Sequence, residues 1–380
     1  MKLMHLSDLH LGKRLIDVSL LEDQKFILDQ IIRIAAEEQP KVVMIAGDVY
    51  DRSNPPAEAM TLFAGFLRHL TALGSTVLVI SGNHDSSERV AYLGELVREN
   101  GVYLSPVYDG HIEPVCLFDE YGEVRFYLMP YIHPASVCQF FPDAEISSSC
   151  DAARTVLGEL TLDPAVRNVI LSHQFISGSA FDDPDQRAVG TLDSVDASLF
   201  DSFDYVALGH IHRPQAVGRK DGTMRYCGSP LKYSQREAAT EKSVTFIDLG
   251  PKGNVRQWQK QLKPLREVHL VRGAFDRLIE QGPVPGTEND YYFITLTNEE
   301  DIANAAAQLR QRFGKVLALD FDNARTRAGG SIVLGNIDAE QKRPIELLME
   351  LYRATHHTDM SDEARAFAEQ AMRETEGFDE

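Results

Sequence analysis

The fold is indicated most directly by residues 3–10, Leu3-Met4-His5-Leu6-Ser7-Asp8-Leu9-His10. The first half is a short apolar run typical of a buried strand, and the second half places polar side chains where that strand would end. Two further apolar runs, 42–45 and 77–80, end in Gly47-Asp48 and in Gly82-Asn83-His84-Asp85. Because ligand sites in open α/β sheets lie at the carboxyl ends of strands, we expect these polar clusters to meet in space.

Amphipathic stretches separate these runs. Residues 21–36 and 57–73 have the periodicity of helices, which predicts strand, helix, strand, helix, strand. Short strands are expected over 102–128, a helix over 152–160, and strands over 168–171 and 205–208 that lead into Ser172-His173 and Gly209-His210-Ile211-His212. The runs 215–218, 224–227, 243–249 and 255–262 predict a second sheet packed on the first. We therefore expect a four-layer α/β/β/α sandwich.

The chain is expected to contain further parts beyond this sandwich. We place the sandwich at residues 1–263 and a small α+β domain at 264–322, where 268–271, 274–280, 291–297, 302–312 and 316–321 read as β-α-β-α-β. Residues 323–342 are punctuated by Gly and Asn like a linker. Residues 343–380 carry two helical patterns, 344–352 and 362–373, and the second is acidic and short. It either frays in solution or docks on a partner.

Composition limits the classes of function. At 380 residues and 43% hydrophobic content, the chain is long enough for a large core and smaller units. Residues 1–7 put only a short apolar run before Asp8, so we expect no membrane span and a cytoplasmic location. The cysteines form no Cys-x-x-Cys pair, which argues against a disulfide framework and a thiolate zinc site. The net charge of -19 repels a polyanion, unless bound cations or a partner subunit reverse the local sign.

The polar clusters fit a centre of two metal ions. Hydrolysis of a phosphodiester needs its charge neutralised, a hydroxide generated and the leaving oxygen stabilised, and two ions about 3.5–4 Å apart do all three when one carboxylate bridges them. We expect Asp48 to be the bridge, since Gly47 before it permits close approach of an ion. Asp8 and His10, two residues apart at a strand end, point to the same side.

The remaining ligands follow from the same geometry. His210 and His212 are again two residues apart, Asn83 offers a carbonyl oxygen, and His173 a nitrogen. The full set of expected ligands is Asp8, His10, Asp48, Asn83, His173, His210 and His212. A mixture of oxygen and imidazole without thiolate suits Mn²⁺, Fe or Zn²⁺ better than Mg²⁺, and we favour Mn²⁺.

The order of these clusters along the chain resembles that in the calcineurin-like metallophosphoesterases. The exact residues of four motifs resemble those of nuclease subunits of the SbcD type. These motifs are His5-Leu6-Ser7-Asp8-Leu9-His10-Leu11-Gly12, Ala46-Gly47-Asp48-Val49-Tyr50-Asp51, Ser81-Gly82-Asn83-His84-Asp85-Ser86 and Tyr226-Cys227-Gly228-Ser229-Pro230-Leu231-Lys232-Tyr233-Ser234. The resemblance covers roughly residues 1–250. Beyond them, the small domain matches the family's capping domain in position and pattern, and the carboxyl-terminal helices match its ATPase-binding segment by place.

The resemblance implies roles for the site residues. One ion would be held by Asp8, His10, Asp48 and His212, and the other by Asp48, Asn83, His173 and His210. His84 would contact the scissile phosphate without binding metal. The implied activity is that of an Mn²⁺-dependent exonuclease and endonuclease that trims double-stranded DNA ends and opens hairpins. The implied partner is an SbcC-like coiled-coil ATPase, with a homodimer of this chain inside a heterotetramer.

Two acidic residues compete as partners of His84. Archaeal and eukaryotic members of the family carry a histidine where Asp51 stands, and an acidic side chain there would favour protonated His84, which suits a proton donor to the leaving group. Asp85 is the alternative partner, or it holds the loop by accepting backbone N–H bonds. Several basic residues near the motifs are candidate contacts to DNA phosphates or ordinary surface charges: Lys13, Arg14, Arg52, Arg89, Lys232 and Arg236.

Two other functions remain open at this point. The same metal set could serve a phosphomonoesterase or a small-molecule phosphodiesterase, although such an enzyme has no evident use for the small domain and the acidic tail. A non-catalytic binding subunit could retain the fold, but it predicts a damaged ligand set, and the expected ligands are all present.

Overall fold

The computed structural model describes residues 1–92, 94–180, 194–300, 302–324 and 326, together with the isolated positions 349, 352, 360, 361 and 365. The expected linker and the expected carboxyl-terminal helices fall almost wholly outside these described residues. The chain divides into two units, one of residues 1–271, 281–294 and 306–319, the other of residues 272–280, 295–305 and 320–380. The domain boundaries expected from the sequence stay predictions.

The first sheet has the strand order β14-β13-β1-β4-β5-β6. Its parallel part consists of β1 (Lys2–Leu6), β4 (Val42–Ala46), β5 (Thr76–Ile80) and β6 (Val102–Leu104). β13 (Ser243–Leu249) pairs antiparallel with β1, and β14 (Val255–Gln261) pairs antiparallel with β13. The crossovers that parallel pairing requires are α1 (Leu21–Glu38) between β1 and β4, α2 (Ala57–Ala72) between β4 and β5, and α3 (Ser87–Ala91) with α4 (Gly94–Arg98) between β5 and β6.

The second sheet has the order β11-β12-β10-β9-β8-β7. Its strands are β7 (Val115–Asp119), β8 (Gly122–Met129), β9 (Arg167–His173), β10 (Tyr205–Gly209), β11 (Gln215–Ala216) and β12 (Met224–Tyr226). The strands β8, β9, β10 and β12 run parallel to one another. The carboxyl ends of β9 and β10 therefore lie together.

One sequence prediction about the sheets is wrong. The runs 243–249 and 255–262 were expected in the second sheet with 215–218 and 224–227, but β13 and β14 extend the first sheet. The physical reason is that β13 pairs with β1, where Lys2 lies opposite Asp248, which is distant in the sequence. Strand periodicity shows that a segment is a strand, but it carries no information on such a distant partner.

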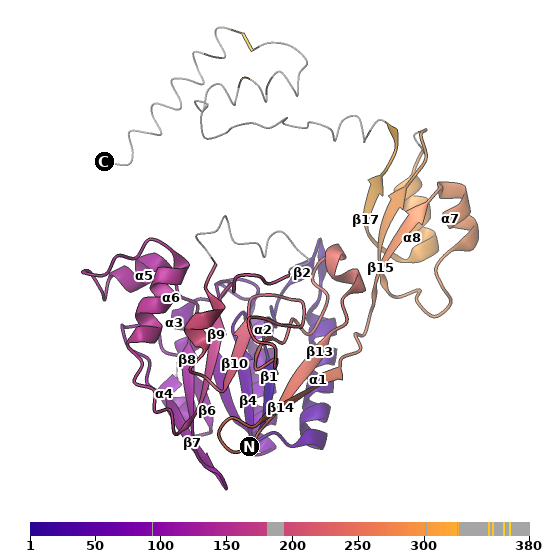
Figure 1. The fold of residues 1–380 in the computed structure, drawn as a ribbon. Helices are drawn as coiled ribbons and strands as arrows, with labels where there is room; N and C mark the ends of the chain where they lie inside the picture. The colour runs from indigo at the N-terminus through magenta and orange to yellow at the C-terminus, as the bar shows by residue number, and fades with distance from the viewer. Residues whose placement is uncertain are drawn as a thin grey trace. The chain divides into compact units, whose positions relative to one another are not determined.

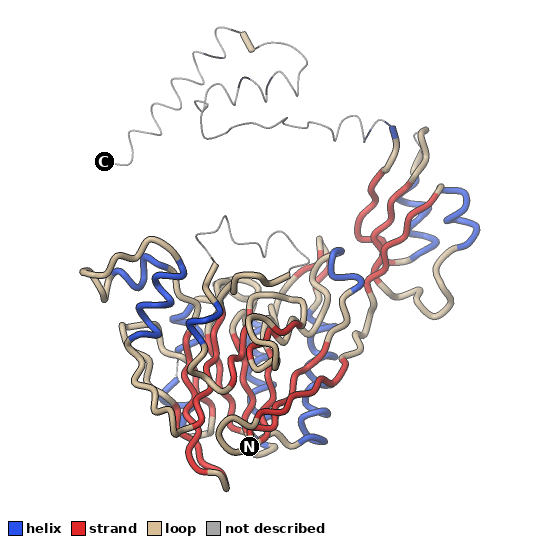
Figure 2. Tube along the Cα trace, viewed as in Figure 1, coloured by secondary structure: helices blue, strands red, loops and turns tan. Residues whose placement is uncertain are grey.

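The two sheets pack face to face with helices outside, which confirms the four-layer α/β/β/α arrangement (Figures 1 and 2). Side chains of β4 alternate between two cores: Val42 and Met44 point between the sheets, whereas Val43 and Ile45 point toward α1 and α2. This is the two-residue period of a strand buried on both faces.

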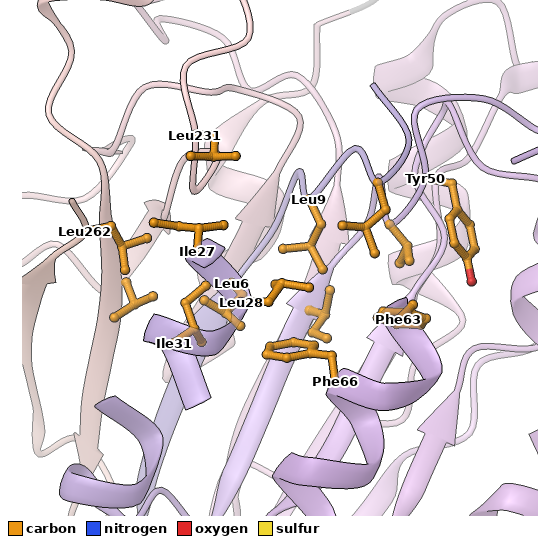
Figure 3. Close-up of a cluster of buried hydrophobic side chains, with 14 of the residues drawn as sticks. Leu6, Leu9, Ile27, Leu28, Ile31, Tyr50, Phe63, Phe66, Leu231 and Leu262 are labelled. Carbon is orange, nitrogen blue, oxygen red and sulfur yellow. The ribbon is translucent and has the colours of Figure 1, made fainter. Parts of the chain in front are cut away.

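The helices cover the outer faces of both sheets. On the first sheet, α1 and α2 contribute Ile27, Ile31 and Phe66, which gather around Leu6 and Leu9 (Figure 3). On the second sheet, α5 (Pro134–Cys138), α6 (Ser149–Gly158) and the 3-10 helix η3 (Ala197–Phe200) cover a core of their own. Among the described residues, no helix has both the length and the apolar character needed to cross a membrane.

Short elements lie around the sheet ends. They are the hairpin β2 (Arg14–Leu15) and β3 (Val18–Ser19), the helices α3 (Ser87–Ala91) and α4 (Gly94–Arg98), and the 3-10 helix η4 (Gln235–Ala239). The hairpin, α3 and η4 closely follow candidate site motifs in the sequence.

The β-α-β-α-β pattern predicted after residue 263 is present. It consists of β15 (Val268–Gly273), α7 (Phe275–Gln281), β16 (Tyr291–Leu296), α8 (Ala305–Phe313) and β17 (Lys315–Phe321), with the sheet order β15-β16-β17. Buried Asp23 of α1 accepts hydrogen bonds from Arg266 Nη1 and from the Tyr291 hydroxyl, both at 2.8 Å. Val268 and Phe293 also belong to the same hydrophobic core as α1.

Candidate metal centre

The site is built from strand ends of both sheets. Asp8 follows β1, Asp48 follows β4, and Asn83 follows β5, while His173 ends β9 and His210 follows β10. Backbone hydrogen bonds tie the first two loops together, from Asp8 N to Gly47 O (3.0 Å) and from His10 N to Asp48 O (2.9 Å). The parallel strands thus deliver their polar ends to one edge, as the sequence predicts.

One group of side chains gathers around His10. Ligand atoms of Asp8, His10 and His212 lie within 4.8 Å of one another, and the three residues are buried. His10 Nε2 is 3.0 Å from His212 Nε2 and 3.5 Å from Asp48 Oδ2. Two imidazole nitrogens that face each other beside two carboxylates form a pattern that a shared cation satisfies.

A second group gathers around His173. Ligand atoms of Asp8, Asp48 and His173 lie within 4.8 Å of one another. Asn83 Oδ1 is 3.1 Å from both His173 Nε2 and His210 Nδ1, so its carbonyl oxygen faces two imidazoles. The structure therefore brings all of the expected ligands into these two groups.

Asp48 lies between the groups. Its Oδ2 atom is 3.5 Å from His10 Nε2 and 3.3 Å from His173 Nε2, while its Oδ1 accepts a hydrogen bond from His84 N at 2.9 Å. The hydrogen bond from His84 N to Oδ1 fixes the orientation of the carboxylate, so Oδ2 stays directed toward both groups. This is the arrangement that a bridging carboxylate requires.

The electrostatics of the buried groups favour a cation. Burial raises the pKa of Asp48. The positive charge of His173 and the hydrogen bond between His173 and Asp48 outweigh this effect and lower the pKa of Asp48 well below its usual range. Although burial opposes it, the negative charge of Asp48 raises the pKa of His173 to about 9. Burial and His173 lower the pKa of His210 to about 4, and burial lowers that of His10. The field of the carboxylates thus attracts positive charge to Asp48, and the mixed oxygen and nitrogen donors fit a divalent transition metal.

The backbone of the site is strained. Asp8, His10, Asp48 and His210 have positive φ angles of 53°, 43°, 49° and 102°. Residues other than glycine rarely adopt this region, at a cost of order 1–3 kcal/mol each, and such residues concentrate at functional sites. Four expected ligands therefore share a conformation that folding alone does not favour.

Three glycines permit the close packing of the ligands. A Cβ atom on Gly82 would lie 2.2 Å from Asp48 Oδ1, and one on Gly209 would lie 1.8 Å from Ala46 O. Gly47, which the sequence pattern favours for close approach, lies against His173, because a Cβ atom there would lie 2.2 Å from His173 Nδ1.

Asp51 contacts His84 through its backbone and not through its carboxylate. The Asp51 carbonyl oxygen accepts a hydrogen bond from His84 Nδ1 at 3.0 Å. The carboxylate instead pairs with Lys13 Nζ at 2.8 Å and lies 3.6 Å from His10 Nδ1. The expected acidic partner of His84 is thus replaced by a neutral acceptor, because the chain turns the Asp51 side chain toward Lys13 and His10.

Asp85 holds the loops after β4 and β5 together, which is the second of the two roles that the sequence leaves open for this residue. Its carboxylate accepts hydrogen bonds from the backbone N–H groups of Val49, Tyr50 and Gly82, at 3.0, 2.9 and 2.9 Å. Burial and the charge of Asp48 raise the pKa of Asp85 to about 6. Asp85 therefore joins the loop after β4 to the loop after β5.

Sequence reasoning missed a buried carboxylate behind His212. Glu237 Oε1 lies 3.1 Å from His212 Nδ1, and Lys242 Nζ lies 2.5 Å from Glu237 Oε2. The pattern Ser234-x-x-Glu237 is visible in the sequence, but it reads as an ordinary helix-capping box. Nothing in it points to a histidine distant in the sequence.

The basic candidates differ in their surroundings. Arg14, Arg52, Arg89 and Arg236 are exposed, and Lys13 is paired with Asp51. Lys232 donates to Ala238 O (2.6 Å) and to Glu267 (2.7 Å), so its charge is matched within the chain.

Comparison with known proteins agrees with this geometry. Residues 1–214 match the model of the family described as calcineurin-like phosphoesterase. The chain belongs to this family. It is therefore a metal-dependent hydrolase of phosphoesters, and its fold is the metallophosphoesterase fold.

Individual relatives are similar over most of the chain. The SbcD component of the nuclease SbcCD of Staphylococcus epidermidis is 32% identical over 331 residues, which cover 85% of this chain and 87% of that protein. Among solved structures, a dimetal phosphatase from Danio rerio is similar at 12% identity, with a TM-score of 0.42, over 70% of this chain and 98% of the other.

Proposed function

We propose that this calcineurin-like phosphoesterase is a DNA nuclease that cuts phosphodiester bonds at double-stranded ends and in hairpins with two Mn²⁺ ions. The observation that carries the proposal is Asp48 Oδ2, which faces His10 on one side and His173 on the other. Similarity to the SbcD component of a nuclease over 85% of the chain supports the nuclease activity.

The two groups of side chains would hold one ion each. Asp8, His10 and His212 would bind the first, Asn83, His173 and His210 the second, and Asp48 both. When bound, the ions supply charge neutralisation and a hydroxide near neutral pH. Asp48 would be held ready for this role, because His84 N donates to its Oδ1 while its Oδ2 faces both groups.

His84 is the proposed catalytic residue of the chain. It lies beside His10, with ring centroids 4.8 Å apart, and it is exposed toward solvent. Its Nδ1 donates to the Asp51 carbonyl oxygen, which leaves Nε2 to face a substrate. We propose that Nε2 transfers a proton to the leaving oxygen, and that Asp51 acts through its backbone on His84 and through its carboxylate on His10 and Lys13.

The DNA would be gripped by exposed cations near the strand ends. Arg14, Arg52 and Arg89 are our exposed candidates for phosphate contacts, whereas the pairing of Lys13 with Asp51 and of Lys232 with Glu267 makes these two lysines poorer ones. Since the chain carries a net charge of -19, the two ions would provide most of the local positive charge.

The segments after residue 263 would serve a complex with other protein chains. We propose that residues 264–322 form a capping domain and that residues 343–380 dock on an SbcC-like coiled-coil ATPase, with two copies of the chain in a heterotetramer in the cytoplasm. The name of the relative, which places it in a nuclease called SbcCD, motivates this proposal.

A hairpin assay tests the function. With Mn²⁺ present, wild type is expected to cut a hairpin and degrade linear duplex DNA, while Asp48→Ala and His84→Ala lose at least about 100-fold of this activity. His84→Ala is expected to bind Mn²⁺ as wild type does, because His84 is not among the proposed ligands. Hydrolysis of a nitrophenyl ester without cleavage of DNA would overturn the nuclease proposal in favour of a small-substrate enzyme.

A further inference from the structure

Three imidazoles of the proposed centre have unequal partners at Nδ1. His212 Nδ1 lies 3.1 Å from the Glu237 carboxylate, whereas His10 Nδ1 lies 3.6 Å from the Asp51 carboxylate, beyond hydrogen-bond distance. His173 Nδ1 lies 2.8 Å from the backbone oxygen of Ala46. His212 thus contacts a carboxylate at hydrogen-bond distance, and His173 contacts a neutral carbonyl.

Glu237 is held rigidly behind His212. It is 1% exposed, and its Oε2 accepts from Lys242 Nζ at 2.5 Å and from the Ser229 hydroxyl at 3.4 Å. Lys242 Nζ also donates to Ser229 Oγ (2.8 Å) and to His212 O (3.0 Å). The same ammonium therefore fixes both the carboxylate and the backbone of the histidine that the carboxylate contacts.

The Glu237 carboxylate determines which nitrogen of His212 carries the proton. Lys242 Nζ lies 2.5 Å from Glu237 Oε2, and this ammonium pairs with the carboxylate, so the carboxylate is an acceptor for His212. His212 Nδ1–H then donates to Glu237, and the lone pair of Nε2 is directed toward His10. A carboxylate behind a histidine also makes the opposite nitrogen a stronger electron donor.

Tyr233 also contacts the imidazoles of the group around His10. Its ring packs edge-on against His10 and His212, at centroid distances of 5.4 and 5.8 Å, and its hydroxyl donates to Leu9 O. Tyr233, Ser229 and Glu237 all come from residues 228–239, so one loop and its 3-10 helix position the imidazoles of the group around His10.

We propose that Glu237 is a positioning residue that makes the two ion sites unequal, so that the site of Asp8, His10 and His212 binds its ion more tightly than the site of Asn83, His173 and His210. The proposal rests on the two-metal centre of the proposed function. The tighter site keeps its ion between turnovers, and the weaker site fills at higher metal concentration.

Titration of the full chain with Mn²⁺, by calorimetry and by the EPR signal of unbound Mn²⁺, tests the proposal. Wild type is expected to show two classes of site. Glu237→Gln keeps the size of the side chain but removes its charge, and we expect it to weaken the tight class about 10–100-fold while the weak class stays unchanged.

Glu241→Gln is the matched control. Glu241 lies four positions further along, is exposed, and accepts a hydrogen bond from Gln261 Nε2 at 2.8 Å. Neither class of site is expected to change in this variant. A role of Glu237 in folding alone would lower thermal stability without altering one class selectively, and that result would overturn the proposal.

A second pair of variants does not depend on the folding of Glu237→Gln. Asn83→Ala is expected to keep the tight class and lose the weak one, and His212→Ala the reverse. Equal affinities in these two variants would overturn the inference but leave the two-metal nuclease intact. A wild-type chain that binds fewer than two ions would instead overturn the proposed function itself.

Discussion

At the scale of single residues, the candidate metal centre depends on contacts so close that no additional side-chain atom fits between them. The Asp48 carboxylate lies against Gly82, whose missing side chain creates the room for Oδ1. Asp48 itself has a positive φ of 49°, so its backbone is already held away from its preferred conformation. An added methyl group cannot be absorbed by small rotations of this residue.

Gly82→Ala is therefore expected to displace the Asp48 carboxylate, which is the proposed bridge between the two ions. A Cβ atom at this position would lie 2.2 Å from Asp48 Oδ1 and 2.4 Å from Asp48 N, and the backbone must move to relieve the clash. Mn²⁺ affinity measured by calorimetry should fall at least about 10-fold, by comparison with the loss of a ligand's supporting contact.

Gly65→Ala is the control for this variant. Gly65 lies within α2, and a Cβ atom there has nothing within 4 Å. Alanine should raise the free energy of unfolding by roughly 0.5–1 kcal/mol and leave metal binding unchanged. Equal metal affinity in both alanine variants would show that the approach of Gly82 to Asp48 is unimportant.

His5 gives a prediction for pH. Burial and Arg225 lower the pKa of His5 to about 3, and Tyr205 contacts its Nδ1 at 3.0 Å. Since the folded pKa is below the unfolded value of about 6.5, the unfolded chain binds the extra proton between these values, and stability falls as pH falls. His5→Gln should reduce the loss of unfolding free energy between about pH 7 and about pH 5, by at most about 1.4 kcal/mol per pH unit. Urea unfolding with unchanged pH dependence would contradict this.

The proposed ligands could be found from the sequence, whereas their supports could not. Asp8 and His173 follow strand-like runs, and strand ends in α/β sheets converge by topology. Glu237 reaches His212 through the path of a loop, and Asp51 reaches His84 through its backbone, which no side-chain pattern reports.

At the scale of elements, the loops after β4 and β5 behave as one unit because Asp85 joins them. The backbone N–H groups of Val49 and Tyr50 from one loop, and of Gly82 from the other, all donate to its carboxylate. Loops that carry Asp48 and Asn83 are thereby fixed relative to each other.

Asp85→Ala should loosen both loops. Loss of the acceptor leaves the N–H groups of Val49, Tyr50 and Gly82 unpaired, and we expect the free energy of unfolding to fall by at least about 2 kcal/mol. Thermal or urea unfolding measures the loss, and Mn²⁺ affinity should fall with it. Asp17→Ala, at an exposed position in the turn between β2 and β3, should change neither quantity.

The longer strands and helices were predictable to within a few residues, whereas the short helices α3, α4 and α5, the 3-10 helices η3 and η4 and the hairpin β2–β3 were not predicted, nor was the assignment of β13 and β14 to the first sheet. Periodicity and apolar runs locate β1, β4 and β5, and the alternation along β4 matches its two cores. The pairing of β13 with β1 joins opposite ends of the sandwich sequence. Such pairing depends on tertiary packing and not on local pattern.

At the scale of the whole molecule, one core extends across the boundary predicted at residue 263. Val268, Tyr291 and Phe293 pack in the same hydrophobic cluster as α1, and Asp23 of α1 pairs with Arg266. Gln24, next to Asp23, donates to His10 O at 2.7 Å. The start of α1 thus contacts both the metal loop and the segment after residue 263.

Arg266→Ala tests the weight of this contact. Asp23 would remain buried without its cationic partner, and removal of one member of a buried pair costs about 3–5 kcal/mol. Urea unfolding should show a loss of at least about 3 kcal/mol. Arg272→Ala breaks an exposed ion pair with Asp322 and should cost no more than about 1 kcal/mol. Similar losses in the two variants would mean that the Asp23 pair is not special.

The most direct test of the whole account is the EPR spectrum of the full chain loaded with Mn²⁺. A carboxylate shared by two ions couples their spins, so wild type should bind two ions and give the spectrum of a coupled pair. Asp48→Asn should give only the signal of isolated Mn²⁺. Two ions without coupling in wild type, or a coupled pair that survives in Asp48→Asn, would contradict the central claim that Asp48 bridges the centre.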